Sequence, residues 1–164
     1  MKKHRVLLLV HEGLVPREGI PLAEVDPAWR MEWDVVTTLR ERGHELKVIG
    51  VHDDLTPIRS SIEEFKPDIV FNLLEAFDNI CVFDQNVVSY LELLKIPYTG
   101  CNPRGLTLAR DKALARKLLA YHRIPSPAFK VIPFGRKPVL PKKLGFPLIV
   151  KSLTYEGSAS ISQA

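Results

Sequence analysis

Apolar segments of strand length alternate with amphipathic segments of helix length over the first hundred residues of the chain. The apolar segments occupy residues 5–10, 45–51, 69–74 and 96–99. Because they lack a polar face, they are typical of strands buried between two layers of helices. The order β-α-β-α-β-α-β predicts an α/β fold with a parallel sheet, right-handed crossovers and helices on both sides. Ligands of such sheets bind beyond the carboxyl ends of the strands.

Helix-start and helix-stop residues stand between these apolar segments. Asp26-Pro27 offers an N-cap followed by proline at the first helical position, and Gly43 offers the stop. Thr56-Pro57 repeats this start signal, with Thr56 as the cap of a short helix that ends near Phe65. Asp84 is expected to cap a third helix. The positions of these helix-start and helix-stop residues therefore agree with the apolar pattern.

The character of the sequence changes near residue 103, which divides the chain into a first domain, 1–103, and a second part, 104–164. A helical stretch opens at Asn102-Pro103 and runs to Tyr121 with a break near Arg110. Two further apolar segments, separated by a basic connection, predict strands at Phe129–Phe134 and Phe146–Lys151.

The net charge of +4 conceals a division between the two parts. Residues 1–100 carry 11 Lys and Arg against 17 Asp and Glu, whereas residues 101–164 carry 12 against 2. A local basic surplus favours a polyanion, such as nucleic acid or nucleotide phosphates, or acidic residues elsewhere in the protein. Aromatic residues are not interleaved with the basic ones, and no recognition helix or RNA-binding signature occurs, so we expect no nucleic-acid partner.

Composition excludes several classes of protein. With 164 residues, of which 46% are apolar, the chain can bury a sizeable core, and disordered or disulfide-scaffold classes are excluded. Cys81 and Cys101 show no metal-ligand spacing, which favours two reduced thiols in a cytoplasmic protein over a disulfide or a metal site. The apolar run Val6–Val10 is too short for an export signal, and no segment reaches membrane-spanning length.

Polar residues gather where the predicted strands end. His11-Glu12 and His52-Asp53 each pair a titratable ring with a carboxylate directly after a strand. Ordinary loop polarity is the favoured interpretation, because HExxH is absent and nothing fixes a metal geometry. Glu75, Asp78 and Asp84 follow the third strand and either coordinate an ion or cap helices, and capping is favoured.

A lysine that ends an apolar strand before a loop of small residues is typical of phosphate binding. Lys151 precedes Glu156-Gly157-Ser158, where backbone N–H groups can converge on phosphate oxygens while the lysine supplies charge. A solvated lysine before a turn is the alternative. Lys112, next to Asp111, is a second candidate. The common fingerprints GxxxxGK[ST] and GxGxxG are both absent.

Five segments carry a family resemblance, namely Ile69–Glu75, Leu91–Gly100, Leu106–Lys112, Arg123–Pro127 and Leu144–Lys151. In order and spacing they resemble ligases similar to D-alanine:D-alanine ligase, of the ATP-grasp superfamily. The resemblance covers residues 66–164 closely and residues 1–65 by fold pattern. It implies a Rossmann-like pre-ATP-grasp domain followed by an incomplete first lobe of the ATP-grasp fold, with a second lobe beyond residue 164.

By position, the resemblance implies that Lys112 and Lys151 contact ATP and that Glu156, Gly157 and Ser158 belong to the loop that closes over its phosphates. It implies no catalytic residue and no metal ligand within the chain, because the acidic ligands of Mg²⁺ are expected in the second lobe. A small amino-acid or carboxylate substrate is implied beside ATP. Arg116 stands where the family usually has a second lysine.

The implied reaction joins a carboxylate to an amine through an acylphosphate and forms a peptide or amide bond. Leu74–Asp78 replaces the His-Gly and Gly-Glu-Asp-Gly segments expected after the third strand, which leaves the carboxylate and the amine open. We expect the 164 residues alone to be inactive. Two alternatives stay open: a non-catalytic nucleotide- or ligand-binding module, and a Rossmann-like structural domain that forms a homodimer.

Overall fold

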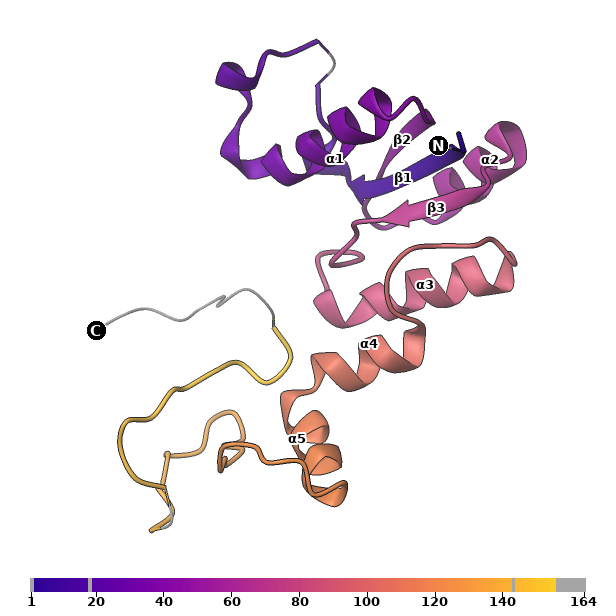
Figure 1. Ribbon diagram of the computed structural model, residues 1–164. Helices are drawn as coiled ribbons and strands as arrows, with labels where there is room; N and C mark the ends of the chain where they lie inside the picture. The colour runs from indigo at the N-terminus through magenta and orange to yellow at the C-terminus, as the bar shows by residue number, and fades with distance from the viewer. Residues whose placement is uncertain (1, 18, 143, 156–164) are drawn as a thin grey trace. The chain divides into compact units, whose positions relative to one another are not determined.

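The structure, a computed structural model, describes residues 2–17, 19–142 and 144–155. The chain divides into two compact units, one that ends at Pro103 and one that begins at Arg104 (Figure 1). The first unit holds the sheet, with helices on both of its faces. None of the described helices has the length and apolar character needed to cross a membrane.

A three-stranded parallel sheet forms the centre of the first unit. Strand β1 (Arg5–His11) lies between β2 (Glu45–Val51) and β3 (Ile69–Asn72), in the order β2-β1-β3. In this register Leu8 lies opposite Val48 on one side and Phe71 on the other. The parallel sheet that the apolar segments predict is therefore confirmed, although β3 ends two residues earlier than predicted.

The fourth predicted strand, residues 96–99, forms only a single parallel bridge between Tyr98 and Val70. Val70 N–H donates to the Pro97 carbonyl at 2.8 Å, and Thr99 N–H donates to the Val70 carbonyl at 2.9 Å. The pairing stops on both sides for local reasons. Pro97 has no N–H to extend it backward, and the Thr99 hydroxyl accepts Asn72 N–H at 3.1 Å in place of a main-chain carbonyl.

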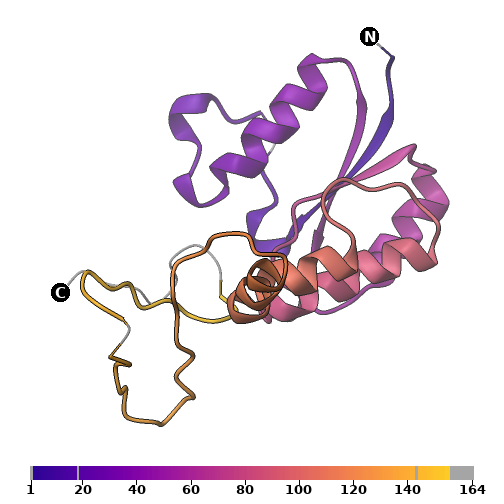
Figure 2. The same cartoon turned by 60° about the horizontal axis from the view of Figure 1, so that its bottom comes forward.

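Helices cover both faces of the sheet, as predicted (Figure 2). Helix α1 (Arg30–Glu41) packs Val36 against Leu8 and Val10 on one face. Helices α2 (Thr56–Phe65) and α3 (Asp84–Leu93) pack on the other face, where Leu7 and Leu9 point. Successive residues of β1 thus enter opposite cores, which explains why this strand has no polar face.

The helix starts differ in detail from the sequence signals. Asp26 accepts Ala28 N–H at 2.8 Å, as a cap should, but it opens a 3₁₀ turn (Pro27–Trp29) before α1 begins. The prediction that Thr56 caps α2 is wrong. Thr56 is already helical, and Asp54 accepts its N–H at 2.8 Å, so the carboxylate two residues earlier satisfies this donor. Further 3₁₀ turns lie at Glu12–Leu14, Leu22–Glu24 and Cys81–Phe83.

The second unit contains helix α4, which begins at the boundary (Pro103–Arg110), and helix α5 (Lys112–Tyr121). The break predicted near Arg110 is confirmed, because Asp111 leaves the helical conformation and caps α5 by accepting the N–H groups of Ala113 and Leu114, each at 2.9 Å. The expected ATP-grasp lobe is not shown by these elements.

The prediction of strands at Phe129–Phe134 and Phe146–Lys151 is wrong: both segments are irregular. A strand is stable only when a neighbour takes its backbone N–H and C=O groups. The two segments do not pair with each other, and the described residues after Pro103 contain no strand. Val150 is accordingly 82% exposed despite its strand-like sequence context.

Candidate functional site

Lys112 is held against the segment that leads into the predicted phosphate loop. Its Nζ donates to the Tyr155 carbonyl at 2.6 Å and to the Leu153 carbonyl at 3.5 Å. Its backbone N–H donates to the same Leu153 carbonyl at 3.2 Å. The first turn of α5, capped by Asp111, therefore fixes residues 153–155 through both main chain and side chain.

The other predicted phosphate ligands are not brought together with Lys112 by any described contact. Lys151 is exposed, and among the described residues its ammonium makes no hydrogen bond or ion pair. Because Phe146–Lys151 is not a strand, Lys151 does not end one. Glu156, Gly157 and Ser158 lie outside the described residues, so the structure tests none of the three.

Arg116 stands where the family resemblance leads us to expect a lysine, and its side chain contacts the segment that follows α5. Its Nη1 donates to the Pro127 carbonyl at 3.1 Å, and its guanidinium lies 6.0 Å from the centre of the Phe129 ring. Guanidinium groups suit this combination of carbonyl binding and aromatic stacking better than ammonium groups do. The substitution thus ties α5 to the chain that follows it.

A second group of polar residues lies at the carboxyl edge of the sheet in the first unit. His11 ends β1 and His52 directly follows β2, and the two rings meet edge to face with their centres 5.4 Å apart. Gly13 N–H donates to His11 Nδ1 at 3.1 Å, which places the proton of a neutral His11 ring on Nε2. That Nε2 lies 3.3 Å from His52 Nδ1 and can donate to it.

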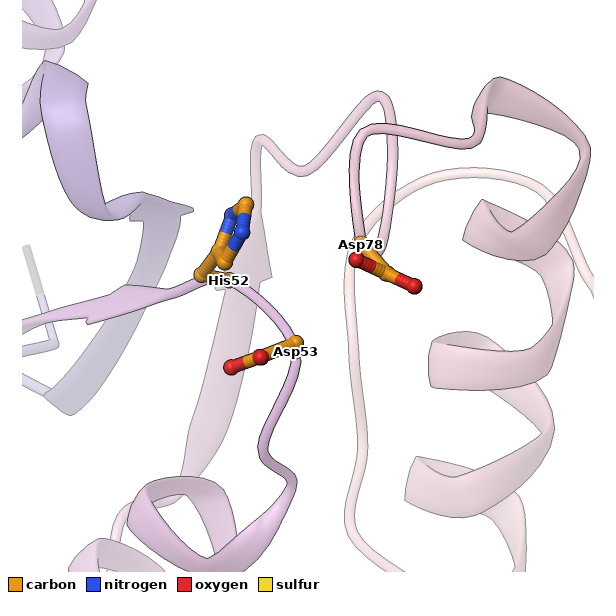
Figure 3. Close-up of side chains that lie close together, drawn as sticks. All are labelled: His52, Asp53 and Asp78. Carbon is orange, nitrogen blue, oxygen red and sulfur yellow. The ribbon is translucent and has the colours of Figure 1, made fainter.

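Two carboxylates complete this edge around His52. One ring nitrogen of His52 and one oxygen from each of Asp53 and Asp78 lie within 4.8 Å of one another (Figure 3). His52 and Asp53 follow β2, whereas Asp78 comes from the loop after β3. Asp78 N–H donates to the His52 carbonyl at 2.8 Å, which fixes the two segments to each other. Glu12 approaches the same ring, with Oε1 3.8 Å from His52 Nδ1.

A glycine explains how the turn after β1 can lie so close to β2. A Cβ on Gly50 would lie 2.8 Å from Glu12 Cα and 2.9 Å from Val15 Cγ2. Only glycine leaves room for this approach. Gly50 thereby brings Glu12 to the ring of His52.

Sequence reasoning placed Asp78 with Glu75 and Asp84 and did not connect it to His52. In the structure Asp84 is buried as the first residue of α3, and Phe83 occupies the N-cap position, so the prediction that Asp84 caps this helix is wrong. The Asp84 carboxylate accepts Gln85 N–H at 2.6 Å, and Glu75 is exposed. The missed signal is positional. Both His52-Asp53 and Asp78 leave the same edge of one parallel sheet, and such segments converge.

The cysteines take no part in these groups. Cys81 is half-buried and Cys101 is exposed, and both are free thiols. The structure therefore agrees with the interpretation of two unpaired cysteines.

Curated proteins similar to this chain include several ligases. A D-alanine–D-alanine ligase of Bordetella pertussis is 40% identical over 76 residues, which cover 46% of this chain and 24% of the relative. A D-alanine–D-alanine ligase of Coprothermobacter proteolyticus is 31% identical over 137 residues, which cover 79% of this chain and 42% of the relative. Protein y4sG of Sinorhizobium fredii, named as uncharacterized, is 30% identical over 150 residues, which cover 85% and 43%.

The chain thus spans less than half the length of these relatives, and the region it matches is the N-terminal part of the ligases. No family model matches the chain. The resemblance that the five sequence segments carry is nevertheless confirmed by these matches.

Proposed function

We propose that this chain, a homologue of the N-terminal part of D-alanine–D-alanine ligases, is the N-terminal portion of an ATP-dependent carboxylate–amine ligase. Residues 1–103 would form the pre-ATP-grasp domain, and residues 104–164 would begin the ATP-grasp domain. The contact of Lys112 with residues 153–155 supports this proposal most directly. The Lys112 ammonium lies beside the Tyr155 carbonyl, one residue before Glu156, and a phosphate site needs a cation near the loop that is proposed to begin there.

In a reaction of this class, a carboxylate oxygen attacks the γ-phosphorus of ATP and releases ADP, which leaves an acylphosphate. An amine then attacks the acyl carbon, loses a proton and displaces phosphate to form an amide bond. Lys112 and Lys151 would bind phosphate oxygens, where their positive charge offsets the charge of the transferring group. Glu156, Gly157 and Ser158 would cover the phosphates and exclude water. The chain contributes binding and positioning in this scheme, and none of its residues is assigned a covalent step.

Lys112 has a second role in this proposal, because its ammonium is shared between carbonyls and a phosphate. An ammonium carries three donors, of which the carbonyls of Leu153 and Tyr155 take two. The remaining donor can reach a phosphate oxygen while the other two keep the segment before Glu156 in place. Lys112 would thus couple nucleotide binding to the position of the loop.

Mg²⁺ is proposed to be held elsewhere in the complete protein. This ion prefers oxygen ligands from carboxylates and phosphates, whereas Lys112 and Lys151 offer only positive charge. Residues 101–164 contain 12 Lys and Arg but only 2 Asp and Glu. This imbalance also favours carboxylate ligands for Mg²⁺ from another part of the protein. A cytoplasmic location is proposed with this function, since both thiols are free.

The test is phosphate release by the complete protein with ATP, Mg²⁺ and D-alanine, in comparison with the 164-residue chain. The proposal expects turnover by the complete protein that depends on D-alanine, which offers both the carboxylate and the amine, and no turnover by the 164 residues alone. ATP binding without any turnover in the complete protein would instead support a non-catalytic nucleotide-binding module. Turnover that is independent of both Lys112 and Lys151 would overturn the assigned site.

A further inference from the structure

The carboxyl edge of the sheet in the first unit brings together a histidine and two aspartates from separate segments. The three candidate donor atoms, on His52, Asp53 and Asp78, lie within 4.8 Å of one another. A neutral imidazole nitrogen and two carboxylate oxygens are each good ligands for divalent ions. Three such donors are the number that a zinc site with an open position takes from the protein.

The fold positions these donors without fixing the carboxylates rigidly. The hydrogen bond from Asp78 N–H to the His52 carbonyl, 2.8 Å long, holds the loop after β3 to the segment after β2. The side chains of Asp53 and Asp78 are exposed and have room to rotate. Tetrahedral ligands at zinc lie about 3.4 Å apart, because each sits 2.0–2.2 Å from the ion. Rotation of the two carboxylates can close the difference from 4.8 Å.

The ligand set also selects the class of ion. Mg²⁺ and Ca²⁺ take oxygen ligands almost exclusively, whereas imidazole suits Zn²⁺ and similar first-row transition ions. The single nitrogen of His52 therefore favours a transition ion, and the two carboxylates balance its charge. The thiols of Cys81 and Cys101 are not among the clustered donors.

Neighbouring residues supply the support that metal-bound histidines need. Such a ring ligates through one nitrogen and donates the other N–H to a carboxylate, a carbonyl or water. In the structure His52 Nδ1 can accept the N–H of His11 Nε2, so ligation through His52 Nε2 requires the His52 ring proton to move to Nδ1 and this bond to break. Glu12 Oε1 lies 3.8 Å from His52 Nδ1, too far for a hydrogen bond, and its negative charge favours a proton on that nitrogen. Gly50 keeps Glu12 at this distance, because it admits the turn after β1 against β2. Glu12 is thus a positioning residue for His52 and not a ligand.

We propose that His52, Asp53 and Asp78 form a binding site for Zn²⁺ or a transition-metal dication of similar preference. The ion would link the segment after β2 to the loop after β3 across the end of β1. This site goes beyond the proposed ligase function and does not depend on it, since the binding is measured without ATP.

The experiment is a Zn²⁺ titration of the 164-residue chain, without an affinity tag, by calorimetry. One ion per chain is expected to bind, and more tightly than Mg²⁺. Asp78→Asn and His52→Gln are each expected to weaken binding at least tenfold. Glu12→Gln should weaken it by less than either of these two variants does, because Glu12 acts through its charge near His52 and does not bind the ion.

A second readout is structural. Co²⁺, which takes the same ligands, reports its geometry through visible absorption bands. The expected spectrum lacks the near-ultraviolet band of cobalt bound to thiolate, and Cys101→Ser should leave it unchanged. Free Zn²⁺ at about 100 times its Kd should raise the unfolding temperature of the first unit by about 10 °C.

Matched variants separate this site from general metal binding. His122→Gln removes an exposed histidine of the second unit and should leave the affinity for Zn²⁺ unchanged. Circular dichroism confirms that each variant is folded. If His52→Gln unfolds the chain, Asp53→Asn and Asp78→Asn still test the site, because both alter exposed side chains. The proposal is overturned if these aspartate variants bind Zn²⁺ as the unaltered chain does, if the chain binds no Zn²⁺, or if it prefers Mg²⁺.

Discussion

The Lys112 ammonium donates to the Tyr155 carbonyl at 2.6 Å, across 43 positions of the sequence. The backbone N–H of Lys112 binds the Leu153 carbonyl in the same turn. The first turn of α5 therefore anchors the segment directly before Glu156, the residue at which the predicted phosphate loop begins. This contact joins Lys112 to the segment before the loop, and the family resemblance assigns both Lys112 and the loop to ATP.

Replacement of Lys112 or Lys151 by alanine should weaken nucleotide binding by the complete protein. Loss of a charge-assisted contact to phosphate costs about 1.5 to 3 kcal/mol, which corresponds to roughly ten- to a hundredfold in affinity. Calorimetric titration with ATP measures the effect, and circular dichroism confirms the fold.

Lys117→Ala provides a matched control for these two variants, because Lys117 is an exposed lysine of the same helix α5. It should leave the affinity for ATP unchanged. Equal affinities for the Lys112, Lys151 and Lys117 variants would show that neither Lys112 nor Lys151 contacts the nucleotide.

The core between the sheet and α2 should be sensitive to truncation at Ile58. This side chain is fully buried with Leu7 and Val70 on the face that α2 and α3 cover. Ile58→Ala removes buried methyl groups and leaves a cavity, so we expect a loss of about 2 to 5 kcal/mol in the free energy of unfolding.

Urea unfolding followed by tryptophan fluorescence measures this loss, because both tryptophans, Trp29 and Trp33, lie in the first unit. Leu93→Ala is the control, since Leu93 is 78% exposed at the end of α3. A similar loss in both variants would contradict the assignment of Ile58 to the core.

Alanine at Gly50 should destabilise the first unit although it adds only one methyl group. The added Cβ would lie 2.8 Å from Glu12 Cα, and a backbone atom does not move as cheaply as the end of a side chain. We expect a cost of about 1 to 3 kcal/mol, measured in the same urea experiment. Gly145→Ala should cost much less, because no atom of the described residues lies within 4 Å of the Cβ that would be added there. Unchanged stability in Gly50→Ala would show that the turn after β1 can move away from β2.

Acid should reduce stability partly through Asp68. The backbone N–H of Arg5 donates to its carboxylate at 2.8 Å and lowers the pKa of Asp68 below its ordinary value, and the nearby charges of His4 and Lys2 lower it further. A lowered pKa means that the folded state favours the ionised form. The contribution is thus present above the ordinary aspartate pKa of about 3.9 and is lost as the pH falls through the lowered value.

Asp68→Asn should therefore be less stable than the unaltered chain at neutral pH, and the difference should shrink in acid. Urea midpoints measured from pH 7 down to about pH 2 follow this difference. His4→Gln should have a smaller effect, because the Arg5 N–H is the largest cause of the lowered pKa. A difference that stays constant with pH would exclude a role for the charge of Asp68.

The parts of the fold that the sequence predicted well are those that pack on both sides. Strand β2 occupies the predicted residues, 45–51, and β1 extends only one residue beyond its predicted end. Leu7 and Leu8 belong to cores on opposite faces of the sheet, and this double burial is what makes the segment continuously apolar. The helix stop at Gly43 is likewise local, because a φ of +76° there favours glycine.

The predictions that failed depended on which group bonds to a backbone N–H or C=O. Phe146–Lys151 has the apolar composition of a strand, but no neighbouring strand among the described residues takes its backbone groups. Thr56 resembles a helix cap, but the carboxylate of Asp54 accepts the N–H in question. In both cases residue type limited the possible structures, and the presence or absence of a particular hydrogen-bond partner selected one.

The sequence by itself determined the parallel sheet with helices on both faces, the break at Asp111 and the relation to ligases, because these depend on local pattern and on residues in fixed order. Only the tertiary structure decided which side chains meet. It placed Asp78 with His52 and not with Asp84, and it placed Lys112 against Tyr155. Such contacts follow from the register of strands and the path of loops, which distant parts of the chain fix together by packing and which no short pattern of residues encodes.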